Sequence, residues 1–167
     1  GFFAPPIFRP REVRRIPEAI ERARSSYRPM LIFVHRDAEK IAHDERRREI
    51  PAEDDIIPII PVRMTEAWLL IDEGALRTAA GNPNGSVPLD IPDIARLERL
   101  PDPKEKLRAL LAEASGLHGR RRQRFDRAEA AARVAELIED FSPLRRLPAF
   151  SAFWDDLVAA LARFPES

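Results

Sequence analysis

Two short apolar runs, each followed by acidic residues, constrain the fold of this chain more than any other feature. Residues 31–34 lead to Asp37 and Glu39, and residues 56–62 lead to Glu66. Short apolar runs followed by helical sequence predict buried strands of an α/β sheet. In such sheets, ligands bind at the carboxyl ends of the strands. The pattern therefore predicts that Asp37 and Glu66 meet at one metal-sized site.

Prolines modify the expected sheet. Pro58 and Pro61 lie in the second run, and each removes a backbone donor, which favours an edge or an irregular strand. The apolar segment from Phe2 to Phe8 is also broken by prolines and predicts a short edge strand or an extended arm.

The sequence after the second run predicts helices. Thr65, Asp72, Asp102 and Asp126 each stand where a side-chain oxygen can cap a following helix. We therefore expect an α/β fold with a small, mostly parallel sheet, flanking helices and an all-helical C-terminal extension. The expected boundaries are residues 1–80 for the core and residues 81–167 for the extension, packed on the core.

Composition limits the function. The chain has no Cys, which excludes disulfides, thiolate metal sites and a cysteine nucleophile. Lys plus Arg and Asp plus Glu number 28 each, so net charge gives no hint of a nucleic-acid partner. No run approaches the length of a membrane span, and no signal peptide is visible. We therefore expect no membrane partner and a cytoplasmic bacterial protein.

The acids after the first strand have two interpretations. His35, Asp37 and Glu39 alternate along the chain and can point to one side. Two carboxylates at this spacing can hold a hard cation such as Mg²⁺, with water and phosphate as further ligands. Alternatively, Asp37 caps the following helix and Glu39 lies in its first turn, near the positive end of the dipole.

Glu66 and Asp72 also have two interpretations. Both could be ligands at the expected metal site. Alternatively, Glu66 is favourable in the first turn of a helix because of the dipole, and Asp72 is a helix cap.

Arginines are concentrated near residue 120. Such a cluster can neutralise phosphates, and Arg can contact them bidentately. The alternative is a solvated turn between helices. The candidates for nucleic-acid binding are Arg120, Arg121, Arg122, Arg124 and Arg127. A second arginine run, residues 46–48, is flanked by Glu45 and Glu49 and predicts a surface ion-pair face.

Two segments carry a resemblance to a known family. The stretch Leu31–Glu39 resembles the strand-plus-acid motif of Toprim-fold proteins, which is usually Asp-x-Asp. The segment Pro61–Asp72, with Glu66-Ala67-Trp68-Leu69-Leu70-Ile71-Asp72, is similar to the Glu-x-Trp-Leu-Leu-x-Asp signature of a bacterial family of unknown function with a Toprim-like core. The segments at residues 102–104 and 151–153 are also similar to that family.

The resemblance implies divalent-metal phosphoryl transfer on nucleic acid, as in overcoming-lysogenisation-type nucleases. Asp37 matches the second Asp of the motif, and His35 stands where the first is expected. A shifted alignment makes Asp37 and Glu39 the acidic pair instead. The family's first-strand Glu has no counterpart here, because the sequence shows no strand that would carry it. A preceding strand that ends in Glu would favour the enzyme hypothesis.

The leading hypothesis is a Toprim-like nuclease or phosphoryl-transfer enzyme that uses Mg²⁺ or Mn²⁺. The expected catalytic residues are His35, Asp37 and Glu66. The expected metal ligands are Asp37, Glu39, Glu66 and Asp72. The alternative is a non-catalytic interaction module that partners an ATPase, and a third reading is a nucleic-acid-binding protein that acts through the arginine cluster.

Overall fold

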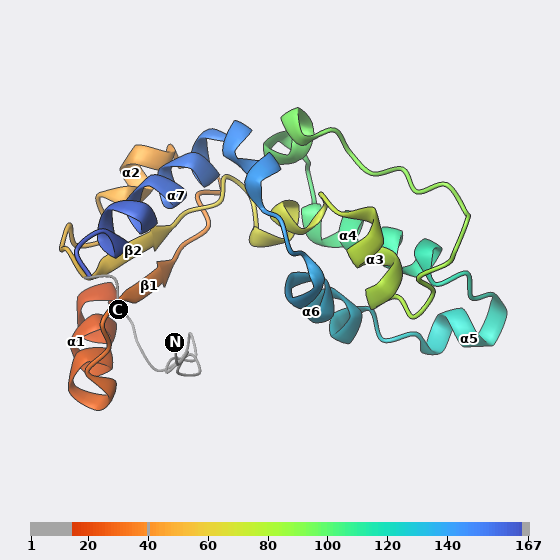
Figure 1. The fold of residues 1–167 in the computed structure, drawn as a ribbon, viewed down its shortest axis with the longest axis horizontal. Coiled ribbons are helices and arrows are strands. Elements are labelled where there is room, and N and C mark those ends of the chain that lie inside the picture. Colours follow the sequence, from red (N-terminus) through yellow and green to blue (C-terminus); the bar gives the residue numbers. More distant parts are fainter. Residues whose placement is uncertain (1–14, 40, 165–167) are drawn as a thin grey trace. The chain divides into compact units, whose positions relative to one another are not determined.

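The structure is a computed structural model that describes residues 15–39 and 41–164. Within these ranges the fold is mixed α/β, with a small two-stranded parallel sheet and a majority of helices (Figure 1). The α/β prediction is thereby confirmed in general terms. The expected strand or arm over Phe2–Phe8 lies outside the described residues.

The chain divides into two compact units. Unit 1 comprises the chain up to Ile60 together with the segment from Ala152 onward, and unit 2 is Pro61–Ser151. This division differs from the expected grouping, because it separates the chain after residue 60 and joins the last helix to the N-terminal part. A domain boundary after residue 80 stays a prediction.

Unit 1 is built around the sheet. Its elements are α1 (Ile16–Tyr27), β1 (Ile32–His35), α2 (His43–Arg47), β2 (Ile56–Ile59) and the larger part of α7 (Pro148–Leu161). Alternate residues of β1 are half-buried and exposed. The half-buried pair, Ile32 and Val34, packs with Ile20 of α1 and with Ile56 in one apolar cluster. The face of the sheet that carries these alternate residues is therefore covered by apolar contacts, as the two-residue period of a β-strand predicts.

Pro58 accounts for the position of β2 at an edge of the sheet. The strands pair in parallel with Val34 opposite Pro58. The carbonyl of Asp55 accepts from the N–H of Ile32, and that of Ile59 accepts from the N–H of Arg36 just after β1. The backbone of the alternate residue Pro58 therefore faces away from β1. Among the described residues no further strand pairs there. The edge position predicted from this proline is confirmed.

Unit 2 is helical in its described part. Its elements are η1 (Thr65–Leu69), α3 (Glu73–Ala79), η2 (Ile94–Arg99), α4 (Pro103–Ala114), α5 (Gly119–Arg124), α6 (Arg127–Leu137) and η3 (Ser142–Arg146), where η marks a 3₁₀ helix. Helices α3, α4 and α6 pack on one another. Leu76, Leu111 and Val134, one from each, are fully buried. Trp68 meets Phe150 edge-on, with ring centroids 5.1 Å apart.

The caps of the unit 2 helices follow the sequence pattern. Asp72, Asp102 and Asp126 accept hydrogen bonds from backbone amides at the starts of α3, α4 and α6. The expectation for Thr65 is wrong, because Met64 is the residue before η1 and it makes no side-chain cap. Local capping signals therefore located the starts of α3, α4 and α6.

Candidate functional site

The candidate residues of the first strand meet at its carboxyl end. β1 ends at His35, and the Nε2 atom of His35 lies 3.2 Å from Oδ1 of Asp37. The His35 side chain is 49% exposed and that of Asp37 is 31% exposed. A neutral imidazole that donates through Nε2 carries its lone pair on Nδ1. The pair can therefore orient an imidazole and move a proton at the sheet edge where α/β proteins bind ligands.

Neighbouring charges form a second group beside this edge. Arg36 donates its backbone N–H to β2, and its side chain contacts Glu49 at 3.0 Å. Arg46 donates Nη1 to both carboxylate oxygens of Glu49 at 2.8 and 3.0 Å. Arg46 first, and then Arg36, lowers the pKa of the Glu49 carboxyl below its usual value. Glu49 therefore stays ionised and joins α2 to the end of β1.

The capping interpretation of Asp37 and Glu39 is wrong. Helix α2 begins only at His43, and Ala42 is the residue before it. Glu39 is exposed and has a φ of 54°, which lies in the left-handed region that is uncommon for a side-chain-bearing residue. Asp37 and Glu39 therefore lie in the turn after β1, where their carboxylates do not serve a helix start.

Glu66 and Asp72 lie in unit 2, whereas Asp37 belongs to unit 1. Glu66 is half-buried in the first turn of η1. Oδ1 of Asp72 accepts from the backbone N–H of Ala75 at 2.9 Å, so the capping interpretation of Asp72 is confirmed. A site shared by Asp37 and Glu66 stays a prediction.

Among the described residues, no three His, Asp or Glu side chains converge on a point that could hold a metal ion. The predicted roles of Asp37, Glu39, Glu66 and Asp72 as ligands stay predictions. Over the same residues, no helix combines the length and the apolar character needed to cross a membrane.

The predicted nucleic-acid-binding arginines lie on and next to α5. Arg120, Arg121, Arg122 and Arg124 are exposed, and no residue of α5 is buried. Arg127 begins α6 and is half-buried. The segment is a short helix, and no contact among the described residues buries its charges. It therefore shares its solvent exposure with the solvated turn of the alternative interpretation and differs from it in backbone conformation.

The other arginine run divides among three surroundings. Arg46 is 93% buried, Arg47 contacts Asp156, and Arg48 is exposed. The prediction of a surface ion-pair face is wrong for Arg46, because its side chain enters unit 1 and only its end meets Glu49. Its long apolar stem makes such burial possible.

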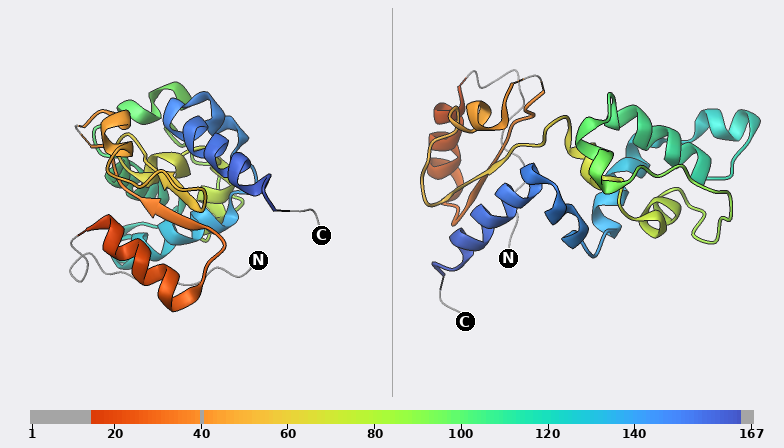
Figure 2. Two further views of the ribbon diagram at one scale, coloured as in Figure 1. Left: turned by 90° about the vertical axis from the view of Figure 1, so that its left-hand side faces the viewer. Right: turned by 90° about the horizontal axis from the view of Figure 1, so that it is seen from above.

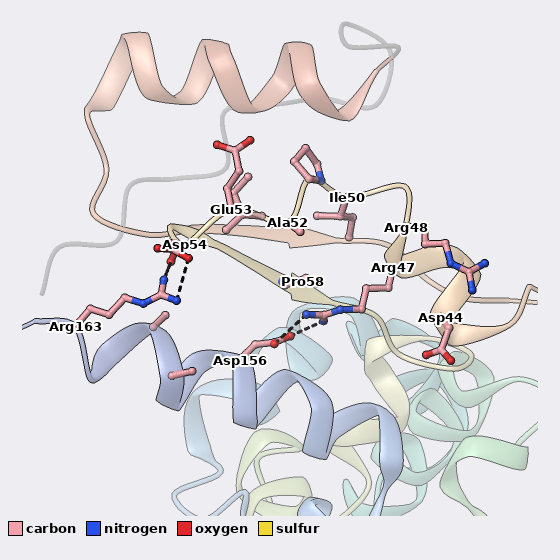
Figure 3. Close-up of a pocket in the computed structure, with 14 residues that line it drawn as sticks. Asp44, Arg47, Arg48, Ile50, Ala52, Glu53, Asp54, Pro58, Asp156 and Arg163 are labelled. Carbon is pink, nitrogen blue, oxygen red and sulfur yellow. Dashed lines mark hydrogen bonds and ion pairs between the residues drawn. The ribbon is translucent and has the colours of Figure 1, made fainter.

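A cavity of about 750 Å³ lies beside β2 in unit 1 (Figure 3). Two ion pairs cross it from α7 and the residues after it. Arg47 donates to both carboxylate oxygens of Asp156, with 2.9 Å between Nη2 and Oδ1. Arg163 contacts the carbonyl and the carboxylate of Asp54 at 2.8 and 2.9 Å. Each charge in these two pairs is compensated, and Asp44, Arg48 and Glu53 are further charged residues of the lining.

The sequence pattern predicted ion pairs around residues 46–48, and the contact of Arg46 with Glu49 has the three-residue spacing that brings side chains together on a helix. The two ion pairs at the cavity were not predicted. Arg47 and Asp156 are 109 residues apart, as are Asp54 and Arg163. No local pattern predicts which distant charges meet.

Comparisons with models of known protein families, with curated proteins and with solved structures find no match.

Proposed function

We propose that this chain is a Toprim-like protein that hydrolyses phosphodiester bonds in nucleic acid, with His35 and Asp37 at its reactive centre. The observation that carries the proposal is the 3.2 Å contact between these side chains at the carboxyl end of a parallel strand. Ligands of open α/β sheets bind outside that end. The resemblance of residues 31–39 and 61–72 to Toprim motifs supports the same assignment.

The chemistry follows from the pair. Oδ1 of Asp37 lies 3.2 Å from Nε2 of His35, and this proximity favours the neutral ring that is protonated on Nε2, whose lone pair lies on Nδ1. Nδ1 takes a proton from water as the water oxygen forms its bond to phosphorus. The bond from phosphorus to the leaving oxygen breaks, and that oxygen takes a proton from solvent. General-base catalysis of this kind contributes roughly 10²–10⁴-fold to a rate.

The carboxyl end of β1 offers at most a few carboxylates for a divalent ion. Mg²⁺ is commonly held by one or two carboxylates together with water and substrate phosphate oxygens. Asp37 is the residue of the pair with that chemistry, and Glu39 is the next carboxylate along the chain. When bound, such an ion polarises a phosphoryl oxygen. Dependence on Mg²⁺ or Mn²⁺ therefore belongs to the proposal.

The test is a cleavage assay with the full chain on single- and double-stranded DNA and RNA, in Mg²⁺, in Mn²⁺ and in chelator. We expect Asp37→Asn and His35→Gln each to slow cleavage by about 100-fold or more. The matched control is another histidine–aspartate pair of unit 1, His43 and Asp44, whose Nδ1 and Oδ1 atoms are 3.7 Å apart. His43→Gln and Asp44→Asn should retain the activity.

Two outcomes would contradict the proposal. One is that none of the four substrates is cleaved under any of the ionic conditions, which would favour the alternative of a non-catalytic module that partners an ATPase. The other is cleavage that Asp37→Asn leaves unchanged, because the activity would then arise elsewhere in the chain or in the preparation.

A further inference from the structure

We propose that the α5 arginine cluster, defined as Arg120, Arg121, Arg122, Arg124 and Arg127, binds the phosphate backbone of a nucleic-acid duplex. This inference rests on the proposed function for the claim that nucleic acid is the substrate. It adds the surface that holds the substrate and the form of nucleic acid that this surface favours.

The first support is the state of the side chains. The four arginines within α5 are exposed, and no member of the cluster makes an ion pair or a side-chain hydrogen bond with another described residue. Each guanidinium has five N–H donors and a permanent charge, and it matches the geometry of a phosphate. The cluster therefore offers donors that no carboxylate in the described chain occupies.

The second support is the nearest acid. Asp126 lies between Arg124 and Arg127 in the sequence and could have neutralised one of them. Its Oδ1 instead accepts from the backbone N–H groups of Ala128 and Glu129, both at 2.9 Å. Because this carboxylate stabilises the start of α6, its contact with the backbone leaves the positive charge of α5 in place.

The third support is the position of the helix within unit 2. α5, drawn in cyan, projects beyond α3, α4 and α6 in Figure 1 and also in the right-hand view of Figure 2. Gly116 precedes it and Gly119 is its first residue, with φ values of 62° and 55°, a left-handed conformation that favours glycine. These two residues turn the chain away from α4 so that the arginine-rich turn reaches solvent.

The arrangement around α5 favours a duplex over a single strand. Arg120 and Arg124 are four residues apart and share a face of the helix, whereas Arg121 and Arg122 project from other sides. One phosphate row can meet only one such face. The major groove of B-form DNA is about 12 Å wide and admits an α-helix, so that phosphates lie on both sides of the helix. Two rows of phosphates can therefore engage arginines that point in different directions.

The composition of the helix favours backbone contacts over base contacts. The sequence of α5, Gly-Arg-Arg-Arg-Gln-Arg, contains no aromatic residue, and Phe125, which follows it, is half-buried, whereas single-strand binders commonly use aromatic side chains as stacking platforms. Phosphate contacts carry no sequence information. The expected ligand is a duplex of any sequence, and binding should weaken steeply with salt because each contact releases counterions.

The test measures fluorescence anisotropy of a labelled duplex of about 20 base pairs, and of its single strand, with the full chain carrying Asp37→Asn to prevent cleavage. We expect the duplex to bind more tightly. The double variants R120Q/R124Q and R121Q/R122Q should each weaken duplex binding by at least about tenfold and lower the salt slope by about 2. The charge-matched control R99Q/R133Q, which removes two exposed arginines of η2 and α6, should change binding little.

Four results would overturn the inference: tighter binding to the single strand, salt-insensitive binding, equal losses in the control, or tighter binding to anionic lipid vesicles or polyglutamate. The two proposals fail separately. Duplex binding that depends on the cluster, without cleavage by the unmodified chain, removes the proposed activity and keeps this surface. Cleavage with duplex binding that the cluster variants leave intact removes only the surface.

Discussion

Two groups of arginines in this chain have the same charge and different surroundings. The paired arginines each contact a carboxylate, and they are Arg24, Arg36, Arg46, Arg47, Arg77 and Arg163. The α5 arginine cluster has no such contact among the described residues. The chain has equal numbers of acidic and basic residues, yet its positive charge is compensated in one group and left exposed in the other. Net charge therefore hides a local excess that a charged ligand would meet.

The paired arginines connect distant parts of the chain. Arg24 of α1 contacts Asp55 at 2.7 Å and Glu53 at 2.6 Å, and both lie about 30 residues away in the loop before β2. Asp55 first, and then Glu53, raises the pKa of the Arg24 guanidinium above its usual value. We expect substitutions in this group to change stability and substitutions in the cluster to change binding. Each prediction below tests that separation.

Removal of Arg77 should have the largest effect on stability. Arg77 is 93% buried and joins Glu73 to the backbone carbonyl of Val87 at 2.6 Å. Arg77→Ala leaves that carbonyl without its donor and opens a cavity. We expect a loss of about 2–4 kcal/mol in the free energy of unfolding, measured by urea denaturation. The control Arg99→Ala, at an exposed position, should change it by less than about 0.5 kcal/mol, and equal losses would contradict the assigned role.

What could be predicted from the sequence depended on the distance between the interacting residues. The caps at Asp72, Asp102 and Asp126 use contacts two or three residues along the chain, so local pattern was sufficient. The two apolar runs, residues 31–34 and 56–62, likewise predicted the strands that the structure has at Ile32–His35 and Ile56–Ile59. Thr65 failed as a cap because η1 has 3₁₀ geometry and begins at Thr65 itself.

The candidate site was predictable only in part. His35 and Asp37 are two residues apart at a strand end, and their contact follows from that placement. No sequence pattern singles out Asp156, and its contact with Arg47 depends on how the last helix folds back in unit 1. Contacts between residues so far apart in the sequence depend on the whole fold, and neither local propensity nor residue spacing predicts them.

The pair formed by Arg47 and Asp156 should contribute less than Arg77. The hydrogen bond to Asp156 raises the pKa of the Arg47 guanidinium, but the two side chains are 43% and 27% exposed. Solvent screening at such exposure limits the interaction to about 1 kcal/mol or less. A double-mutant cycle with Arg47→Ala and Asp156→Ala measures it. The coupling energy should decrease as the salt concentration is raised from about 50 to 500 mM. A coupling energy that does not depend on salt would contradict the solvent-screened ion pair.

Glu49 should make a small, pH-dependent contribution. Arg46 and Arg36 lower its pKa in the folded state, so the unfolded state binds the proton more readily. The stabilisation is present above about pH 4.5 and is lost as the pH falls through the lowered value. The difference in Tm between the unmodified chain and Glu49→Gln should therefore shrink on acidification. Glu136→Gln, at an exposed position of α6, is the control. A difference that grows in acid would show that the sign is wrong.

The α5 arginine cluster should give the smallest effect on stability. Because no residue of α5 is buried and its arginines contact no carboxylate in the described chain, R120Q/R124Q and R121Q/R122Q remove no native interaction. We expect the free energy of unfolding to change by less than about 0.5 kcal/mol in either variant. A small increase in the free energy of unfolding would also agree with this prediction, because the removed charges repel one another at close spacing. A loss as large as that of Arg77→Ala would mean that the cluster holds the fold together, and the separation between paired and exposed arginines would then fail.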